Sequence, residues 1–159
     1  MPRNYLISRK VSITDRFSIT DESGAPQYTV QGRLAFSPQL SLRDPMGTEV
    51  ATIRRPPFSR RYEVVADGHP ATVRPAGAFG RRYEIDSAEG HLAASGNFSG
   101  RQYTISRGAT TAAVVAQQRG LRERFAVEVA DQESPVLMLA LILVIETIRD
   151  RRRAAAASS

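Results

Sequence analysis

Residues 134–153 read SPVLMLALILVIETIRDRRR, and this stretch decides how the rest of the chain is arranged. Ten consecutive residues, 136–145, are apolar. Ser134 is a good helix N-cap and Pro135 suits the first helical position, so the stretch predicts a helix over 135–150. The fourteen residues from Pro135 to Ile148 span about 21 Å as a helix, which is too short for a hydrocarbon layer of about 30 Å. A helix that is apolar on every side must then be enclosed by the rest of the protein.

The composition describes the enclosing part. The chain has 159 residues, no cysteine and a net charge of +6 at pH 7. We expect one domain over residues 1–153 and a flexible Ala/Ser tail over 154–159. No apolar segment follows Met1, so we expect no signal peptide and a cytoplasmic location, at most peripheral at the inner membrane surface. The positive charge favours an anionic partner, either nucleic acid or an acidic lipid surface.

A short pattern repeats along the chain. An aromatic or large aliphatic residue is followed two positions later by an aliphatic residue, and turn residues such as Gly and Asp separate the repeats. Period-two alternation between turns predicts strands with one buried face, joined as hairpins. The pairs are Tyr5 and Ile7, Phe17 and Ile19, Leu40 and Leu42, Tyr62 and Val64, Tyr83 and Ile85, Tyr103 and Ile105, and Phe125 and Val127.

The pattern predicts about twelve strands, and closure of the sheet would remove its exposed edges. Twelve strands about 4.8 Å apart and tilted by about 40° give a barrel of radius about 12 Å, which holds one helix. The sequence therefore predicts a mainly β protein, a closed antiparallel barrel around the C-terminal helix. The expected strands lie near 4–9, 15–21, 26–32, 37–43, 48–55, 60–66, 70–74, 80–86, 91–97, 101–107, 111–117 and 123–130.

Several segments resemble one known family in their order and spacing. They are an opening strand at 4–10, DRFSITDESGAPQYTVQGR at 15–33, LSLRDPMGTEVATIRR at 40–55, Asn97-Phe98, and the apolar helix that follows residues 127–131. Together they resemble the LURP-one-related family of the Tubby C-terminal-like superfamily, which includes phospholipid scramblases. The resemblance implies a twelve-stranded barrel around a hydrophobic helix and a link to membrane phospholipids, because Tubby domains bind phosphoinositides. The cysteine cluster and calcium-binding segment of scramblases have no counterpart here.

The sequence offers no pattern for catalysis or for a cofactor. His69 and His91 each follow a turn glycine, and a pair of histidines falls short of a metal-ligand set. Asp21 and Asp44 lack the spacing of a calcium loop and are interpreted as turn residues. Nucleophile elbows and phosphate-binding glycine loops are absent. We therefore expect a protein that is not an enzyme and that has no cofactor or metal.

Arginine pairs near the strand ends are the candidate binding residues. Alternate loops of a meander meet at one rim, so these residues form a predicted basic crown with two aromatic side chains among them. Such a crown suits acidic phospholipid head groups, and solvated arginines that keep a barrel soluble are the alternative explanation. A protein-interaction module is the second functional hypothesis, and nucleic-acid binding is the third. The crown comprises Arg54, Arg55, Phe58, Arg60, Arg61, Phe79, Arg81, Arg82, Arg119 and Arg122.

Overall fold

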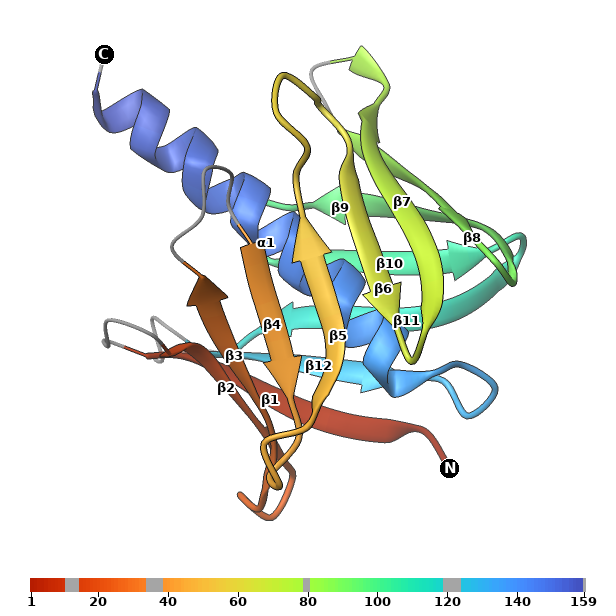
Figure 1. The fold of residues 1–159 in the computed structure, drawn as a ribbon. Helices are drawn as coiled ribbons and strands as arrows, with labels where there is room; N and C mark the ends of the chain where they lie inside the picture. The colour runs from red at the N-terminus through yellow and green to blue at the C-terminus, as the bar shows by residue number, and fades with distance from the viewer. Residues whose placement is uncertain (11–14, 34–38, 79–80, 119–123, 159) are drawn as a thin grey trace.

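A computed structural model describes residues 1–10, 15–33, 39–78, 81–118 and 124–158. The described residues form twelve strands and one helix (Figure 1). The elements are β1 (Arg3–Arg9), β2 (Asp15–Asp21), β3 (Pro26–Arg33), β4 (Gln39–Arg43), β5 (Glu49–Arg54), β6 (Tyr62–Ala66), β7 (His69–Ala76), β8 (Arg82–Ser87), β9 (Gly90–Asn97), β10 (Gln102–Arg107), β11 (Thr110–Gln117), β12 (Arg124–Val129) and α1 (Pro135–Ala157).

The strands form a closed barrel, as predicted. Each strand is antiparallel to the next along the chain, and β1 pairs with β12 to close the ring. In that closing pair Tyr5 lies opposite Val127 and Ile7 lies opposite Phe125. All four of these side chains are buried, because residues opposite each other in a strand pair point to the same face.

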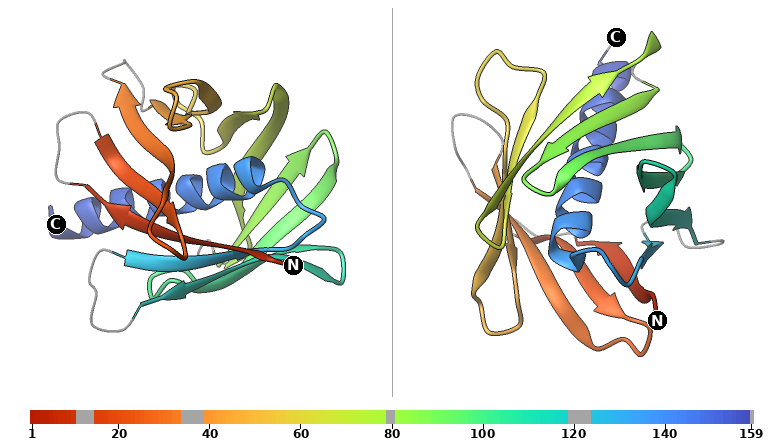
Figure 2. Two further views of the ribbon diagram at one scale, coloured as in Figure 1. Left: turned by 90° about the horizontal axis from the view of Figure 1, so that it is seen from below. Right: turned by 90° about the vertical axis from the view of Figure 1, so that its right-hand side faces the viewer.

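The repeated pairs in the sequence point into the barrel. Every residue of these pairs is buried except Leu40, which is partly buried and packs against the core. The helix fills the space they enclose, and residues 138–145 have no exposed surface. Figure 2 shows strands on opposite sides of α1 in both views. The lumen is therefore occupied by side chains of the helix.

The helix is longer than the sequence analysis predicts. It begins as expected, with Ser134 Oγ accepting a hydrogen bond from the Leu137 N–H at 3.2 Å. It ends at Ala157 instead of 150, so most of the segment expected to be a flexible tail is helical. Arginine and alanine are strong helix formers, so the last turns continue without burial. No helix among the described residues is long and apolar enough to cross a lipid bilayer.

The helix gives the barrel two different rims. At the exit rim, α1 leaves the barrel beside the loops that follow β5, β7 and β9. At the opposite rim lie the N-terminus, the start of α1 and the tight turns, two of which are formed by Asp21 and Asp44 as predicted. Asp21 Oδ1 accepts hydrogen bonds from the backbone of Ser23 and Ala25, and Asp44 Oδ1 from the backbone of Met46 and Thr48.

Candidate functional site

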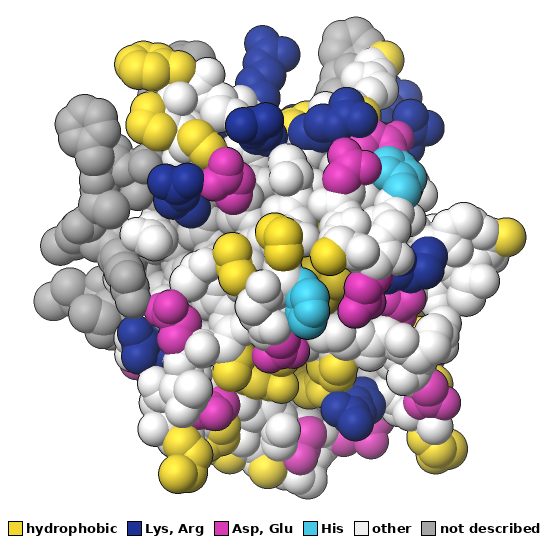
Figure 3. All heavy atoms as spheres, turned by 45° about the vertical axis from the view of Figure 1, so that its right-hand side comes forward, with side chains coloured by type: hydrophobic (Ala, Val, Ile, Leu, Met, Phe, Trp, Pro, Cys, Tyr) yellow, Lys and Arg dark blue, Asp and Glu magenta, His cyan; other side chains and the backbone are white. Residues whose placement is uncertain are grey.

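Charge is divided between the two rims. The exit rim is rich in arginine, and Lys and Arg side chains gather along the upper edge of the face shown in Figure 3. The opposite rim carries acids in its turns and in the segment before α1. Those acids are Asp21, Glu22, Asp44, Asp67, Glu89, Asp131 and Glu133. The barrel is therefore electrically polar along the helix axis, which a net charge of +6 alone does not reveal.

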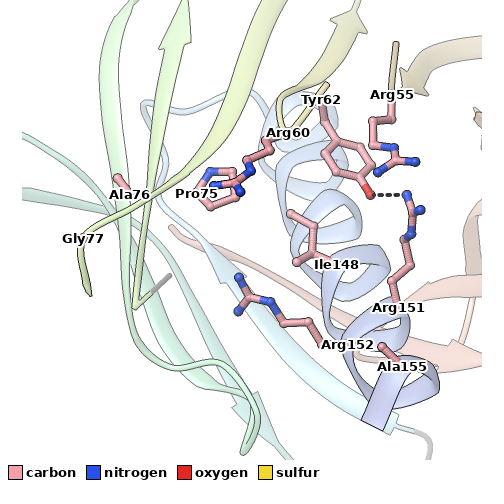
Figure 4. A pocket seen from close by; sticks show the side chains of 10 residues that line it. All are labelled: Arg55, Arg60, Tyr62, Pro75, Ala76, Gly77, Ile148, Arg151, Arg152 and Ala155. Atoms are coloured by element: carbon pink, nitrogen blue, oxygen red, sulfur yellow. Dashed lines mark hydrogen bonds between the residues drawn. The ribbon is translucent and has the colours of Figure 1, made fainter. Parts of the chain in front are cut away.

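A hollow of about 640 Å³ opens at the exit rim between α1, the β5–β6 loop and the end of β7. We call it the Tyr62 hollow. Four arginine side chains surround it, two from the helix and two from the loop, while its floor is apolar (Figure 4). Its lining consists of Arg55, Arg60, Tyr62, Pro75, Ala76, Gly77, Ile148, Arg151, Arg152 and Ala155.

Helix periodicity explains how α1 contributes to this hollow. Residues three, four and seven positions apart lie on one face of a helix. Ile148, Arg151, Arg152 and Ala155 follow this spacing and line the Tyr62 hollow together. The last buried turn therefore supplies the floor, and the first exposed turn supplies two cations.

The arginines of the Tyr62 hollow lack carboxylate partners in the described part of the chain. Arg151 Nη1 donates a hydrogen bond to the Tyr62 hydroxyl at 3.3 Å, and neither this arginine nor Arg55, Arg60 or Arg152 forms an ion pair there. The Nε atom of Arg55 is buried and has no hydrogen-bond partner among the residues that the structure describes. Four nearby positive charges without a counter-charge favour a multivalent anion in this hollow.

Other members of the predicted crown are arranged differently. Arg54 pairs with Glu63 at 2.6 Å and Arg82 pairs with Glu84 at 2.8 Å, so a carboxylate balances each of these charges. Arg61 and Arg81 are exposed at the same rim but do not line the hollow. Phe79, Arg119 and Arg122 lie outside the described residues.

Phe58 stands at the tip of the β5–β6 loop. Its side chain is fully exposed, and its backbone has a φ of 59°. The turn beneath it is closed by a hydrogen bond of 3.2 Å from the Ser59 N–H to the Pro56 carbonyl. Exposure of a large aromatic ring to water at a loop tip is unfavourable, and this ring packs against no part of the described fold. It is therefore suited to an apolar surface outside the protein.

A buried ion pair lies just inside the exit rim. Arg101 is 2% exposed and Glu146 is 0% exposed, and the Arg101 Nε donates to Glu146 Oε1 at 2.8 Å. Burial raises the pKa of the Glu146 carboxyl, and Arg101 opposes that rise. Burial also raises the pKa of Tyr103, whose hydroxyl lies 3.5 Å from Glu146 Oε2. Residue spacing along the chain does not reveal this pair, although Glu146 is the first charged residue after the apolar run.

The described residues hold no group of three or more His, Cys, Asp or Glu side chains placed to bind a metal ion. His91 instead contacts two carboxylates of the neighbouring strand, with its Nδ1 3.0 Å from Asp86 Oδ1 and its Nε2 close to Glu84. His69 is the first residue of β7. The guanidinium groups of the exit rim can bind anions through charge-assisted hydrogen bonds.

Comparisons with known proteins agree with the overall fold of the barrel. An X-ray structure of a protein from Arabidopsis thaliana superposes with a TM-score of 0.69 at 20% sequence identity, covering 92% of this chain and 91% of that chain. No curated protein sequence matches this chain. The sequence pattern of the LURP-one-related family matches residues 3–146. The chain therefore belongs to the LURP-one-related family.

Proposed function

We propose that this protein binds anionic phospholipid surfaces peripherally, with the exit rim facing the membrane, and that it does so without catalysis. The observation that carries the proposal is the Tyr62 hollow, where four arginines surround one opening and none of them forms an ion pair with a described carboxylate. Each cation near an anionic surface contributes about 1 kcal/mol, so four of them give a substantial attraction.

The charge division between the rims supports one orientation. The exit rim attracts a negative surface, while the acids of the opposite rim are repelled by it. In this orientation Phe58 also points toward the lipid, where an aromatic ring is stable at the level of the head groups. Electrostatic attraction and aromatic insertion thus act at the same end of the barrel.

The test is sedimentation with vesicles of phosphatidylcholine alone and of phosphatidylcholine with phosphatidylserine, at low and high salt. We expect binding only to the acidic vesicles and weaker binding at high salt, because salt screens exposed charges. The variant Arg60→Glu/Arg151→Glu reverses two charges of the hollow and should lose binding.

The matched control is Arg3→Glu/Arg74→Glu, which changes the net charge equally at exposed positions that do not line the hollow. Equal loss in the two variants would show that only net charge matters and would contradict the proposed site. Binding to neither kind of vesicle would refute the proposal. Protein partners and nucleic acid, the two other hypotheses from the sequence, stay predictions.

A further inference from the structure

A second hollow lies on another side of the last helical turns. It has a volume of about 440 Å³ and is enclosed by α1, β8 and the β9–β10 loop. We call it the Tyr83 hollow. Its lining includes Tyr83, Phe98, Ser99, Arg149, Arg153 and Ala156, and Arg152 separates it from the Tyr62 hollow. Residues 149, 152, 153 and 156 repeat the helical spacing of the first hollow, displaced by one residue along the chain.

One wall of the Tyr83 hollow is aromatic. Tyr83 is buried, and the ring of Phe98 meets it edge-on with the ring centres 4.8 Å apart. Phe98 also contacts Tyr103 at 4.9 Å between ring centres. This stack joins the hollow to the barrel core, and the Ala156 methyl group faces it from the helix side. The wall suits a hydrocarbon body.

The other wall is cationic, and it contains an unused donor. Arg149 Nε donates to the Ser99 carbonyl at 3.3 Å, while Arg149 Nη1 is buried and has no hydrogen-bond partner in the described part of the chain. The Arg149 guanidinium is therefore incompletely hydrogen-bonded, which favours an anionic ligand at this wall. Burial, followed by the charge of Arg101, lowers the pKa of Arg149, and a nearby anion would oppose this by stabilising the charged guanidinium. Arg153 adds a second cation at the opening.

We propose that the Tyr83 hollow binds an amphipathic monoanion with a carboxylate head, such as a fatty carboxylate of medium chain length. The carboxylate would accept hydrogen bonds from Arg149, and the hydrocarbon body would lie against Tyr83, Phe98 and Ala156. The barrel lumen is filled by the helix, so the hydrocarbon body of the ligand stays in the hollow at the rim and does not enter the barrel core. This site is distinct from the membrane-facing Tyr62 hollow and does not depend on the function proposed for it.

The test is calorimetric titration of the full chain with decanoate below its aggregation concentration, together with NMR of the aromatic rings. We expect saturable binding at one site and shifts of the Tyr83 and Phe98 signals. The variant Arg149→Met keeps most of the aliphatic stem and should weaken binding at least about tenfold. Ala156→Phe fills the hollow from an exposed helix position, so it should abolish binding without disturbing the core.

Three controls make the result specific. Ala154→Phe adds the same ring at a helix position that lines neither hollow, and Arg60→Ser alters only the Tyr62 hollow, so both variants should bind decanoate like the unchanged chain. Decanol tests the need for the carboxylate, and inorganic phosphate tests the need for the hydrocarbon body. Equal binding of decanol, equal competition by phosphate, undiminished binding in Arg149→Met, or no saturable decanoate binding would each overturn the proposal.

Discussion

Arg101 and Glu146 form an ion pair inside the barrel, 2.8 Å between Nε and Oε1, although the two residues are 45 positions apart. Arg101 adopts a φ of 53° in the loop before β10, and its guanidinium lies 4.7 Å from the centre of the Phe125 ring. Its Nη1 donates to Gln117 Oε1 at 3.3 Å. This one side chain therefore joins the β9–β10 loop, two strands and the helix.

Removing one partner of this pair should destabilise the fold strongly. We expect Arg101→Met to lower the free energy of unfolding by about 3–5 kcal/mol, because it leaves a buried carboxylate without its counter-charge. The double variant Arg101→Met/Glu146→Leu removes both charges and should recover much of that loss. Urea unfolding of the single and double variants measures the difference. A double variant no more stable than Arg101→Met would contradict this account.

The Arg101→Met variant should also acquire a characteristic pH dependence. Without Arg101 the main opposition to burial is lost and only the more weakly acting Arg149 remains, so the pKa of Glu146 rises further in the folded state. Stability is then fully present below the unfolded pKa of the carboxyl and is lost as the pH rises toward the folded value. Part of the stability of Arg101→Met should therefore return in acid, which unfolding curves at several pH values would reveal.

The exposed end of the helix should be dispensable for folding and necessary for membrane binding. The last buried helical residue is Ile148, and residues 151–158 are exposed. A chain ending at Asp150 keeps the two hydrogen bonds from Arg9 Nη2 to Asp150, at 2.7 and 2.6 Å, and should unfold at nearly the same temperature. It loses Arg151 and Arg152, so its binding to acidic vesicles should fall sharply. Full vesicle binding by the shortened chain would show that the end of the helix is not part of the membrane-binding site.

Two exposed apolar tips provide a matched test of orientation. Phe58 projects at the exit rim and Met46 at the opposite rim, and the side chains of both are almost fully exposed. We expect Phe58→Ser to weaken binding to acidic vesicles and Met46→Ser to leave it unchanged. Neither substitution touches the core, so thermal unfolding should be alike in the two variants. A larger effect of Met46→Ser would indicate the reverse orientation.

Gly96 is required by close approach of the backbone as well as by its conformation. It has a φ of 132°, and a Cβ atom there would lie 2.7 Å from the Gln102 carbonyl oxygen and 2.8 Å from Tyr103 Cα. Gly24 has a φ of 89° but open space around it. Gly24→Ala should cost about 1–2 kcal/mol through backbone strain. Gly96→Ala should lower the free energy of unfolding by more, as measured by urea unfolding of the two variants. Equal losses of unfolding free energy would argue against the steric contribution.

His91 should make stability depend weakly on pH near neutrality. Hydrogen bonding to Asp86, followed by interaction with Glu84, raises the pKa of His91 above its ordinary value of 6.5. The stabilisation is therefore complete below the unfolded pKa and is lost as the pH rises through the folded pKa. The difference in unfolding temperature between the unchanged chain and His91→Gln should shrink from about pH 5 to about pH 8. Asp86→Asn should reduce this pH dependence, and a difference constant with pH would contradict it.

Local patterns were sufficient to predict the strands. Pairs such as Tyr103 and Ile105 alternate with polar residues, and alternation of this kind follows from the geometry of a single strand. The end of the helix was predicted less well, because the apolar run stops at Ile145 while helical propensity continues through arginine and alanine to Ala157. The helix therefore continues beyond its last buried residue, and the hydrophobic pattern predicts only the part of a helix that is buried.

The candidate site was predicted in part. Arg55 and Arg60 were expected at the rim, since they flank a loop, but Arg151 and Arg152, which line the same hollow, were not among the residues of the predicted crown. The neutralisation of Arg54 by Glu63 and of Arg82 by Glu84 depends on which strands are neighbours and on how the side chains turn. Neither the pairing of strands nor the orientation of their side chains can be predicted from the residue spacing within one segment.

By itself, the sequence determined a closed ring of hairpins around an apolar helix, because a helix with no polar side must be enclosed and alternating strands supply one apolar face each. Only the tertiary structure decided that Arg101 neutralises Glu146, that no described carboxylate pairs with the arginines of the Tyr62 hollow, and where the two hollows open. These features depend on distances between segments far apart in the chain, and electrostatic and hydrogen-bond energies change steeply over a few ångströms.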